Sequence, residues 1–191
     1  MAIIVVGGMP GCGKTTVALN LARDLGLEEL VQTDLLKTVL KASGRTDAVV
    51  DTSHNSWRYF GKKTKTSLKR GYLLHTNGYR QLLQGVVQIS TDMGKHLVME
   101  GVQASPANFK VLSGIKAGFY LTCSPEERHF RLLDKQSKRF KPNLEWIKNF
   151  DDICWLDTWL CKEAVQCGMC VIENHDLSAT LEQIKAEVPW T

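Results

Sequence analysis

Residues 8–15 read Gly8-Met9-Pro10-Gly11-Cys12-Gly13-Lys14-Thr15 and fit the phosphate-binding pattern G-x-x-x-x-G-K-[ST] in full. An apolar run at residues 2–7 precedes this loop, and an amphipathic helical pattern at residues 14–25 follows it. In such an arrangement the glycines let backbone N–H groups turn toward a nucleotide's phosphates, which also lie at the positive end of the helix. The sequence therefore predicts a nucleoside triphosphate site.

The side chains of this loop have expected roles in binding ATP together with Mg²⁺. Lys14 should reach the β- and γ-phosphates and act in catalysis, and the Thr15 hydroxyl should bind Mg²⁺. We expect nucleotide contacts from Pro10, Gly11, Cys12, Gly13, Lys14, Thr15 and Thr16. The alternative is a chance glycine-rich turn, and the strand and helix on either side argue against it.

The length and composition of the chain indicate one globular domain over residues 1–191. Of its 191 residues 43% are hydrophobic and 23% are charged, and no repeat or Pro/Gly/Ser-rich linker divides it. No apolar run approaches the roughly 20 residues needed to cross a bilayer, and the start lacks the basic region of a signal peptide. We expect an intracellular, cytoplasmic protein with no membrane partner and with its six cysteines reduced.

Apolar runs alternate with helical patterns along the chain, which is typical of a parallel sheet covered by helices on both faces. We expect strands at residues 2–7, 30–33, 96–100, 117–123 and 169–173. We expect helices at about residues 14–25, 34–43, 72–93, 125–137, 144–167 and 177–187. The prediction is a three-layer α/β P-loop fold with a five-stranded parallel sheet. Ligands of such sheets bind beyond the carboxyl ends of the strands.

Asp34 stands where the second predicted strand meets a helix, so its carboxylate should face the same crevice as the phosphate loop. We favour Asp34 as the general base that accepts a proton from a hydroxyl attacking the γ-phosphate. The alternative is a purely structural helix N-cap. Lys37, one helical turn later, lies on the same face and is a candidate to hold a negative group of the acceptor; a solvated surface lysine is the alternative.

The third predicted strand ends in Glu100-Gly101. An acidic residue after an apolar run in a phosphate-loop protein is typical of a Walker B element, which places Mg²⁺ or polarises it through a water. The alternative is an ordinary carboxylate at the end of a strand. Gln103 follows in a loop that is expected to face the same crevice.

A helix rich in cations begins at Pro125 and opens a predicted lid over about residues 125–141. Phosphoryl transfer depends on cations that neutralise charge in the transition state. Arg128 and Arg131 lie nearest the preceding strand, and we expect at least one of them to be catalytic. The alternative, a solvated amphipathic helix, suits most of the other cations.

The charge of the chain is unevenly distributed, although its net value is only +4. No Asp or Glu occurs from residue 52 to residue 91, which is most of a predicted acceptor-side insertion at about residues 44–95. This stretch carries the cations Arg58, Lys62, Lys63, Lys65, Lys69, Arg70 and Arg80. Interleaved with Trp57, Tyr59 and Phe60, they suit a polyanion with stackable bases. A mobile loop anchored by its aromatic residues is the alternative.

The motifs of the chain together resemble those of the 2-phosphoglycerate kinase family of P-loop kinases. The resemblance covers most of the chain and rests on four segments: the phosphate loop, Thr33-Asp34-Leu35-Leu36-Lys37, Glu100-Gly101-Val102-Gln103-Ala104-Ser105-Pro106 and Cys170-Val171-Ile172-Glu173-Asn174. It implies an ATP- and Mg²⁺-dependent kinase with a lid and a five-stranded parallel core, similar in layout to adenylate kinases. The spacing of Asp34 and Lys37 also looks like the base and arginine of polynucleotide 5′-kinases.

Two positions depart from the family pattern. Gln103 stands where the family has a histidine, and Lys37 stands where it usually has an arginine. The resemblance implies that both positions face the acceptor. The family's roles for the residues that bind the phosphoryl donor therefore carry over to this chain more directly than its roles for the residues that bind the acceptor.

These observations predict a kinase that transfers the γ-phosphoryl group of ATP to a hydroxyl. Because of the acid-free basic stretch we lean toward a hydroxyl on nucleic acid, such as a 5′ end or 5-hydroxymethyluracil in bacteriophage-type modified DNA. The alternative acceptor is 2-phosphoglycerate or a similar acid phosphate. A nucleotide-dependent ATPase switch is the alternative of another class, and the chain lacks the Asn-Lys-x-Asp signature of GTPase switches.

Overall fold

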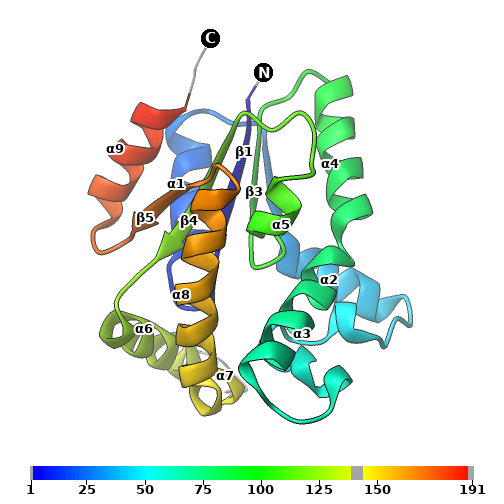
Figure 1. Cartoon of the computed structure of the whole chain (residues 1–191). Coiled ribbons are helices and arrows are strands. Elements are labelled where there is room, and N and C mark those ends of the chain that lie inside the picture. The colour runs from blue at the N-terminus through cyan, green and yellow to red at the C-terminus, as the bar shows by residue number, and fades with distance from the viewer. Residues whose placement is uncertain (1, 139–143, 189–191) are drawn as a thin grey trace.

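The computed structural model describes residues 2–138 and 144–188, which form a five-stranded parallel sheet with helices on both faces (Figure 1). The strand order is β2-β3-β1-β4-β5. The strands are β1 (Ile3–Gly8), β2 (Glu29–Gln32), β3 (Leu97–Glu100), β4 (Ala117–Thr122) and β5 (Cys170–Glu173). The predicted fold and its five strands are confirmed, with bounds that differ by one residue or so.

The helices follow the strands in alternation. They are α1 (Lys14–Asp24), α2 (Thr33–Ala42), the 3₁₀ turns η1 (Ala48–Val50) and η2 (Ser56–Phe60), α3 (Lys65–Asn77), α4 (Arg80–Asp92), α5 (Pro106–Phe109), α6 (Pro125–Ser137), α7 (Glu145–Lys148), α8 (Phe150–Gln166) and α9 (Leu177–Glu187). Within the described residues, no helix is both long enough and apolar enough to cross a membrane.

The central strand β1 divides the apolar core into two layers. Its side chains alternate, so Ile3 and Val5 pack on one face of the sheet while Ile4 and Val6 pack on the other. Helices α3, α4 and α8 cover the first face, and α1 and α9 cover the second. A strand buried on both faces reads as a continuous apolar run, which is why residues 2–7 were recognisable as a strand.

The predicted helix at residues 72–93 is two helices, α3 and α4. The break lies at Gly78, where a β-carbon would overlap the side chain of Val49. The Tyr79 hydroxyl donates a hydrogen bond to the Val49 carbonyl (2.9 Å), which holds the break against η1. Tertiary packing therefore overrides the local helical period. The predicted helix at residues 144–167 is divided in the same way into α7 and α8, at Asn149.

Candidate active site

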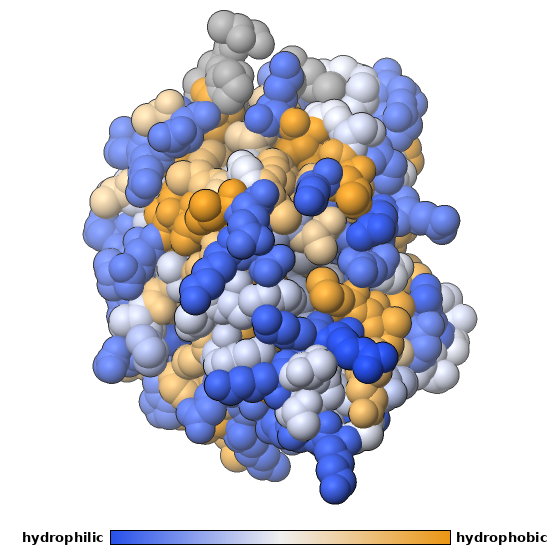
Figure 2. Space-filling model, viewed as in Figure 1, coloured by the Kyte–Doolittle hydropathy of each residue, from blue (hydrophilic) through white to orange (hydrophobic). Residues whose placement is uncertain are grey.

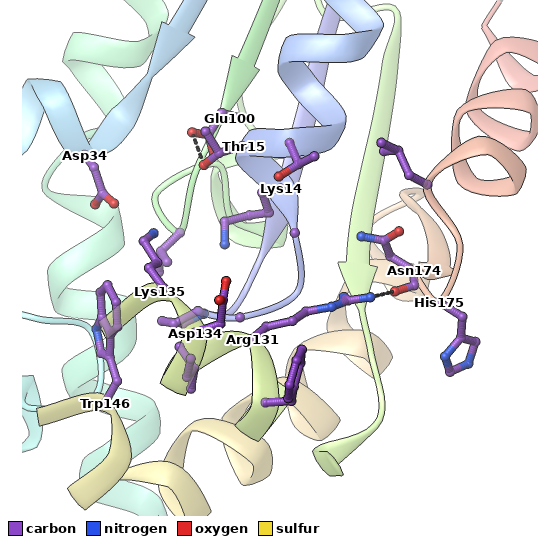
Figure 3. Close-up of a pocket in the computed structure, with 18 residues that line it drawn as sticks. Lys14, Thr15, Asp34, Glu100, Arg131, Asp134, Lys135, Trp146, Asn174 and His175 are labelled. Atoms are coloured by element: carbon purple, nitrogen blue, oxygen red, sulfur yellow. Dashed lines mark hydrogen bonds between the residues drawn. The ribbon is translucent and has the colours of Figure 1, made fainter. Parts of the chain in front are cut away.

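A cavity of about 550 Å³ opens beyond the carboxyl ends of the strands (Figure 3). The loop after β1, the start of α2, the end of β3, helix α6 and the turn after β5 all line it. Parallel pairing explains the convergence, because Val6 lies opposite Glu100 in β3 and Gln32 lies opposite Glu100 from β2. The register thus brings separate segments of the chain to one edge of the sheet.

The phosphate loop lines this cavity with six of its seven predicted residues. These are Pro10, Gly11, Gly13, Lys14, Thr15 and Thr16. The loop needs glycine at Gly11 and Gly13, whose φ angles of 85° and 87° lie in the left-handed region. The Lys14 ammonium donates to the Met9 carbonyl (3.0 Å), so it is folded over its own loop.

Cys12 is the exception among the predicted nucleotide-binding residues. Its side chain is fully buried in the apolar cluster beneath the loop and does not line the cavity. Its carbonyl accepts a hydrogen bond from the Asn174 side chain (2.8 Å). Cys12 therefore contributes packing and backbone geometry to the site, and its thiol faces the core.

Thr15 and Glu100 form the predicted metal-binding pair. The Thr15 hydroxyl donates to Glu100 Oε1 (2.9 Å), as the dashed line in Figure 3 shows. Burial raises the pKa of Glu100 above its ordinary value, and the Lys14 ammonium and the Thr15 hydroxyl oppose this effect. Two oxygen donors at one point suit Mg²⁺, which completes its coordination with phosphate oxygens and water.

The pair fits an Mg²⁺ held mainly by its substrate and water. Among residues 2–138 and 144–188, no group of three or more His, Cys, Asp or Glu side chains could hold a metal ion. Mg²⁺ typically keeps several waters and uses only one or two protein groups in kinase sites. One threonine and one glutamate are thus a donor set of the size that Mg²⁺ uses in such sites.

Asp34 faces the cavity from the first turn of α2, with its side chain 69% exposed. Gln32 occupies the N-cap position, so the alternative reading of Asp34 as a helix cap is wrong. The Lys37 ammonium donates to the Asp34 carboxylate (3.2 Å). Partial desolvation raises the pKa of Asp34, but Lys37, Lys14 and Lys135 together outweigh it and lower this pKa below its ordinary value.

Gln103 does not face the acceptor side of the cavity, contrary to the prediction. Its side chain is buried and bonded at both ends: the Thr33 hydroxyl donates to its Oε1 (2.5 Å), and its amide lies 2.9 Å from His75 Nε2. His75 Nδ1 lies 3.2 Å from the Ala48 carbonyl, which can only accept. The proton is therefore on Nδ1, and Nε2 accepts from the Gln103 amide. This chain of hydrogen bonds fastens Thr33, the neighbour of Asp34, to α3 and η1.

The glycine after Glu100 permits this network. Gly101 has a φ of 141°, and a β-carbon there would overlap the Thr33 hydroxyl. The Glu-Gly pair at the end of β3 thus combines two separate requirements. The carboxylate serves the phosphate loop, and the bare glycine lets the β2–α2 turn approach.

Arg128 is not a lid arginine. It is 1% exposed, and its guanidinium bonds to Asp157 (2.5 Å) and to the Pro10 carbonyl (2.7 Å). Asp157 also accepts hydrogen bonds from the hydroxyls of Tyr120 (2.9 Å) and Thr122 (2.5 Å). Arg128 therefore supports the phosphate loop through the Pro10 carbonyl. It is held in place by the buried carboxylate of Asp157, which accepts three hydrogen bonds.

Arg131 is the arginine that lines the cavity. It donates to the Asn174 carbonyl (2.7 Å) and to Glu127 (3.2 Å), and Figure 3 shows it crossing beneath the loop. Its Nη1 is buried with no hydrogen-bond partner among the described residues. Gly13 is close by, since a β-carbon there would lie 3.8 Å from this nitrogen. Arg131 thus offers a free N–H group beside the phosphate loop, while the predicted lid residues 139–141 lie outside the described parts of the chain.

The cavity is also lined by residues outside the predicted site, among them Lys135, Trp146 and Asn174. Lys135 lies one turn after Arg131, with its ammonium 5.1 Å from the ring centroid of Trp146 (Figure 3). Asn174 joins the loop to β5, since it donates to the Cys12 carbonyl and accepts from the Thr180 hydroxyl (3.0 Å). Its position just after the last strand was the available signal, because strand ends converge on the site.

The cations of the basic stretch lie mainly over aromatic rings of the protein itself. Arg70 lies 4.3 Å from the centroid of Phe60, and Lys69 lies 4.9 Å from that of Trp159. Arg58 and Lys63 both lie over Trp57. Figure 2 shows that this face mixes hydrophilic side chains with smaller apolar patches. The interleaving of cations and aromatics in the sequence is thus used within the fold.

Comparison with known proteins adds a family and a fold. A family described as "AAA domain" matches residues 4–152. The 2-phosphoglycerate kinase of Methanopyrus kandleri is 26% identical, with 95% of this chain and 59% of the relative covered. That of Pyrococcus horikoshii is 25% identical, with 97% and 64% covered. The chain thus spans about three fifths of the length of the curated relatives it matches.

Solved structures with a similar fold include two shikimate kinases. That from Bacteroides thetaiotaomicron has a TM-score of 0.55 at 15% identity and covers 97% of each chain. That from Acinetobacter baumannii, in complex with shikimate, has a TM-score of 0.50 at 19% identity and covers 97% of this chain and 93% of that one. At these identities the likeness concerns the fold alone.

Proposed function

The chain belongs to the AAA-domain family of P-loop proteins, and we propose that it is an ATP-dependent kinase that phosphorylates a hydroxyl of a small acidic molecule. The observation that carries the proposal is the Asp34 carboxylate, which faces the same cavity as Lys14 and the Thr15–Glu100 pair. A triphosphate site needs no such base, whereas phosphoryl transfer to a hydroxyl does. The relatives named 2-phosphoglycerate kinase support 2-phosphoglycerate as the first acceptor to test.

The donor side of the site binds and orients the triphosphate. Lys14 leaves the Met9 carbonyl for the β- and γ-phosphates, and the loop's N–H groups surround them. Arg131 contributes its unpartnered N–H group at the edge of the loop. Bound Mg²⁺, held beside Thr15 and Glu100, would neutralise charge that develops on the phosphates.

The acceptor side positions the attacking hydroxyl. Asp34 accepts its proton as the oxygen bonds to the γ-phosphorus and the bond to the β-phosphate oxygen breaks, which releases ADP. Lys37 and Lys135 are cations near Asp34 that suit an acidic group on the acceptor. An acidic small molecule therefore matches the charge of this side better than a neutral one.

The proposal replaces the nucleic-acid acceptor favoured by the basic stretch. The comparisons that name an acceptor name small molecules, and the cations of the stretch lie over Trp57, Phe60 and Trp159.

The deciding experiment supplies γ-labelled ATP with 2-phosphoglycerate, a 5′-hydroxyl oligonucleotide, DNA containing 5-hydroxymethyluracil, or no acceptor. Transfer to the small acid supports the proposal. Transfer to either polynucleotide alone would refute it, and rapid hydrolysis without acceptor would indicate an ATPase.

Replacing Lys37 should weaken acceptor binding and shift the pH dependence. Lys37→Met removes the cation that lowers the pKa of Asp34, so this pKa should rise. The base works only when it is deprotonated. As the pH is lowered, the variant should therefore lose activity at a higher pH than the wild type does. We expect the KM for 2-phosphoglycerate to rise about tenfold, the loss of one charge-assisted contact. Lys41→Met, on the exposed side of the same helix, is the matched control and should match the wild type in both measurements.

Replacing Glu100 should change the Mg²⁺ requirement. Burial raises the pKa of Glu100, so its carboxylate gains a proton at a higher pH than an exposed one, and apparent Mg²⁺ affinity should fall as the pH is lowered. Glu100→Gln should raise the Mg²⁺ concentration for half-maximal activity about tenfold or more and abolish this pH dependence. Titration of activity with Mg²⁺ at several pH values measures both effects. An unchanged Mg²⁺ requirement would remove Glu100 from the metal site.

A further inference from the structure

Residues 52–57, the turn that leads into η2, concentrate buried polar atoms that lack partners. Among the described residues, no hydrogen-bond partner exists for Thr52 Oγ1, either ring nitrogen of His54, Asn55 Oδ1 or Trp57 Nε1. Most buried polar atoms in folded proteins are hydrogen-bonded, and each exception costs free energy. Five unpartnered buried atoms within six consecutive residues are unusual. Departures of this kind from general folding rules occur mainly at functional sites.

The turn itself is firmly built, so loose structure does not explain these atoms. The Thr52 carbonyl accepts hydrogen bonds from the N–H groups of Asn55 (2.9 Å) and Ser56 (3.1 Å) and from the Ser56 hydroxyl (2.8 Å). Helix α3 lies directly against η2, because a β-carbon on Gly71 would overlap the backbone of Ser56 and Trp57. The turn is thus held by hydrogen bonds to the Thr52 carbonyl and by the contact with α3, while the side-chain atoms named above have no partner.

The turn lies on the acceptor side of the site. The Asn55 amide donates to Glu145 at 3.4 Å, which is long for a hydrogen bond, and the next residue, Trp146, lines the cavity. The charged groups that act on His54 are Glu145, Asp152, Asp51 and Lys37. Lys37 is the residue that holds Asp34. The unpartnered atoms are therefore linked to α7 through Asn55 and are within electrostatic reach of Lys37, while none of residues 52–57 itself lines the cavity.

The chemistry of these atoms suits a hydroxyl group. Burial lowers the pKa of His54 to about 4, so the ring is neutral at pH 7 and has one donor and one acceptor nitrogen. The Trp57 indole donates, the Asn55 carbonyl oxygen accepts, and the Thr52 hydroxyl does both. Three of the four charged groups near His54 are carboxylates, which disfavours an anion. A neutral group that both donates and accepts matches this mixed set.

We infer that residues 52–57 form an acceptor-recognition subsite for an uncharged hydroxyl that the acceptor carries in addition to the one that is phosphorylated. This hydroxyl takes the place of the Glu145 carboxylate as hydrogen-bond partner of the Asn55 amide, and it also bonds to the His54 ring. The acidic part of the acceptor remains at Lys37. The inference rests on the proposed function and narrows its substrate class to acids with two or more hydroxyls. The relatives' 2-phosphoglycerate has only one.

The test uses the full chain and two variants that remove the unpartnered atoms, His54→Leu and Thr52→Val. The probes are 4-phosphoerythronate and glycerate, which keep a second hydroxyl, and 2-phosphoglycerate, which does not. Wild-type kcat/KM should be higher for the first two. Each variant should raise their KM about tenfold, the loss of one hydrogen bond, and leave the KM for ATP unchanged.

Thermal unfolding separates recognition from structure. His54 makes no hydrogen bond within the described residues, so His54→Leu should leave Tm unchanged or raise it. His75 is the matched control, because it is equally buried but bonded at both ring nitrogens. His75→Leu should therefore lower Tm. A lower Tm for His54→Leu with unchanged KM values would make His54 structural and overturn the inference.

The failures of the two proposals are distinguishable. If a small acid is phosphorylated and the variants leave its KM unchanged, the subsite is wrong and the kinase stands. If 2-phosphoglycerate is the preferred acceptor of the wild type, the second hydroxyl is wrong. If none of the three acids is phosphorylated or raises Tm, the small-acid kinase itself is wrong, and the subsite falls with it.

Discussion

Asp34→Asn should lower the rate of phosphoryl transfer by about 10²-fold or more and leave ATP affinity unchanged. Asparagine keeps the size of the side chain but cannot accept the proton of the attacking hydroxyl. The triphosphate contacts come from the loop at residues 8–15 and are not touched by the substitution. Steady-state transfer to 2-phosphoglycerate gives the rate, and binding of a non-hydrolysable ATP analogue gives the affinity.

Asp134→Asn is the matched control for this prediction. Asp134 lines the same cavity and undergoes the same chemical change, but its carboxylate pairs with Lys138 on the exposed part of α6. We expect its turnover to stay within about threefold of the wild type, since exposed ion pairs contribute little. Equal turnover of Asp34→Asn and the wild type would exclude Asp34 as the base.

Arg128→Met should destabilise the protein by about 3–5 kcal/mol, the usual cost of removing one partner of a buried ion pair. Its guanidinium is 1% exposed and is bound to Asp157 and Pro10. Without it, Asp157 keeps only the hydroxyls of Tyr120 and Thr122, and its buried charge loses its counter-ion. Urea unfolding measures the free energy of unfolding.

Two further variants test the physical reason for this loss. The double variant Arg128→Met/Asp157→Leu removes both charges, so it should recover part of the stability lost by Arg128→Met alone. Lys138→Met breaks the exposed pair with Asp134 and should cost less than about 1 kcal/mol. A cost of Arg128→Met as small as that of Lys138→Met would mean that the buried pair contributes nothing special. ATP affinity should also fall for Arg128→Met, because the Pro10 carbonyl loses its donor.

The parts of the fold that were predictable are those with local signals. The phosphate-loop pattern, the fully apolar run of β1 and the alternation of strands with helices each lie within a few consecutive residues. The parallel topology then follows from general rules of chain connection. Helix ends were harder to predict: Gly78 ends α3 because of Val49, a residue 29 positions earlier.

The residues of the candidate site likewise include some whose position is signalled locally and some whose position depends on distant partners. Asp34 and Glu100 lie at or just after strand ends, and Lys14 and Thr15 begin the helix that follows the loop after β1, so their meeting in one cavity could be anticipated from the order of strands and helices. The two arginines of α6 could not be told apart. They are three residues apart on one helix, and only Asp157, supplied by α8, determines that Arg128 turns inward while Arg131 lines the cavity.

The acceptor side shows the same limit most clearly. Gln103 follows Glu100 in a loop that should face the crevice, yet His75 from α3 and Thr33 from the β2–α2 turn draw its side chain into the interior. The amino-acid sequence alone thus predicted the α/β P-loop fold and placed Lys14, Thr15, Asp34 and Glu100 at one edge of its sheet, because these features depend on local periodicity and spacing. The tertiary structure decided which polar side chains face the cavity, because that depends on partners brought together from distant parts of the chain.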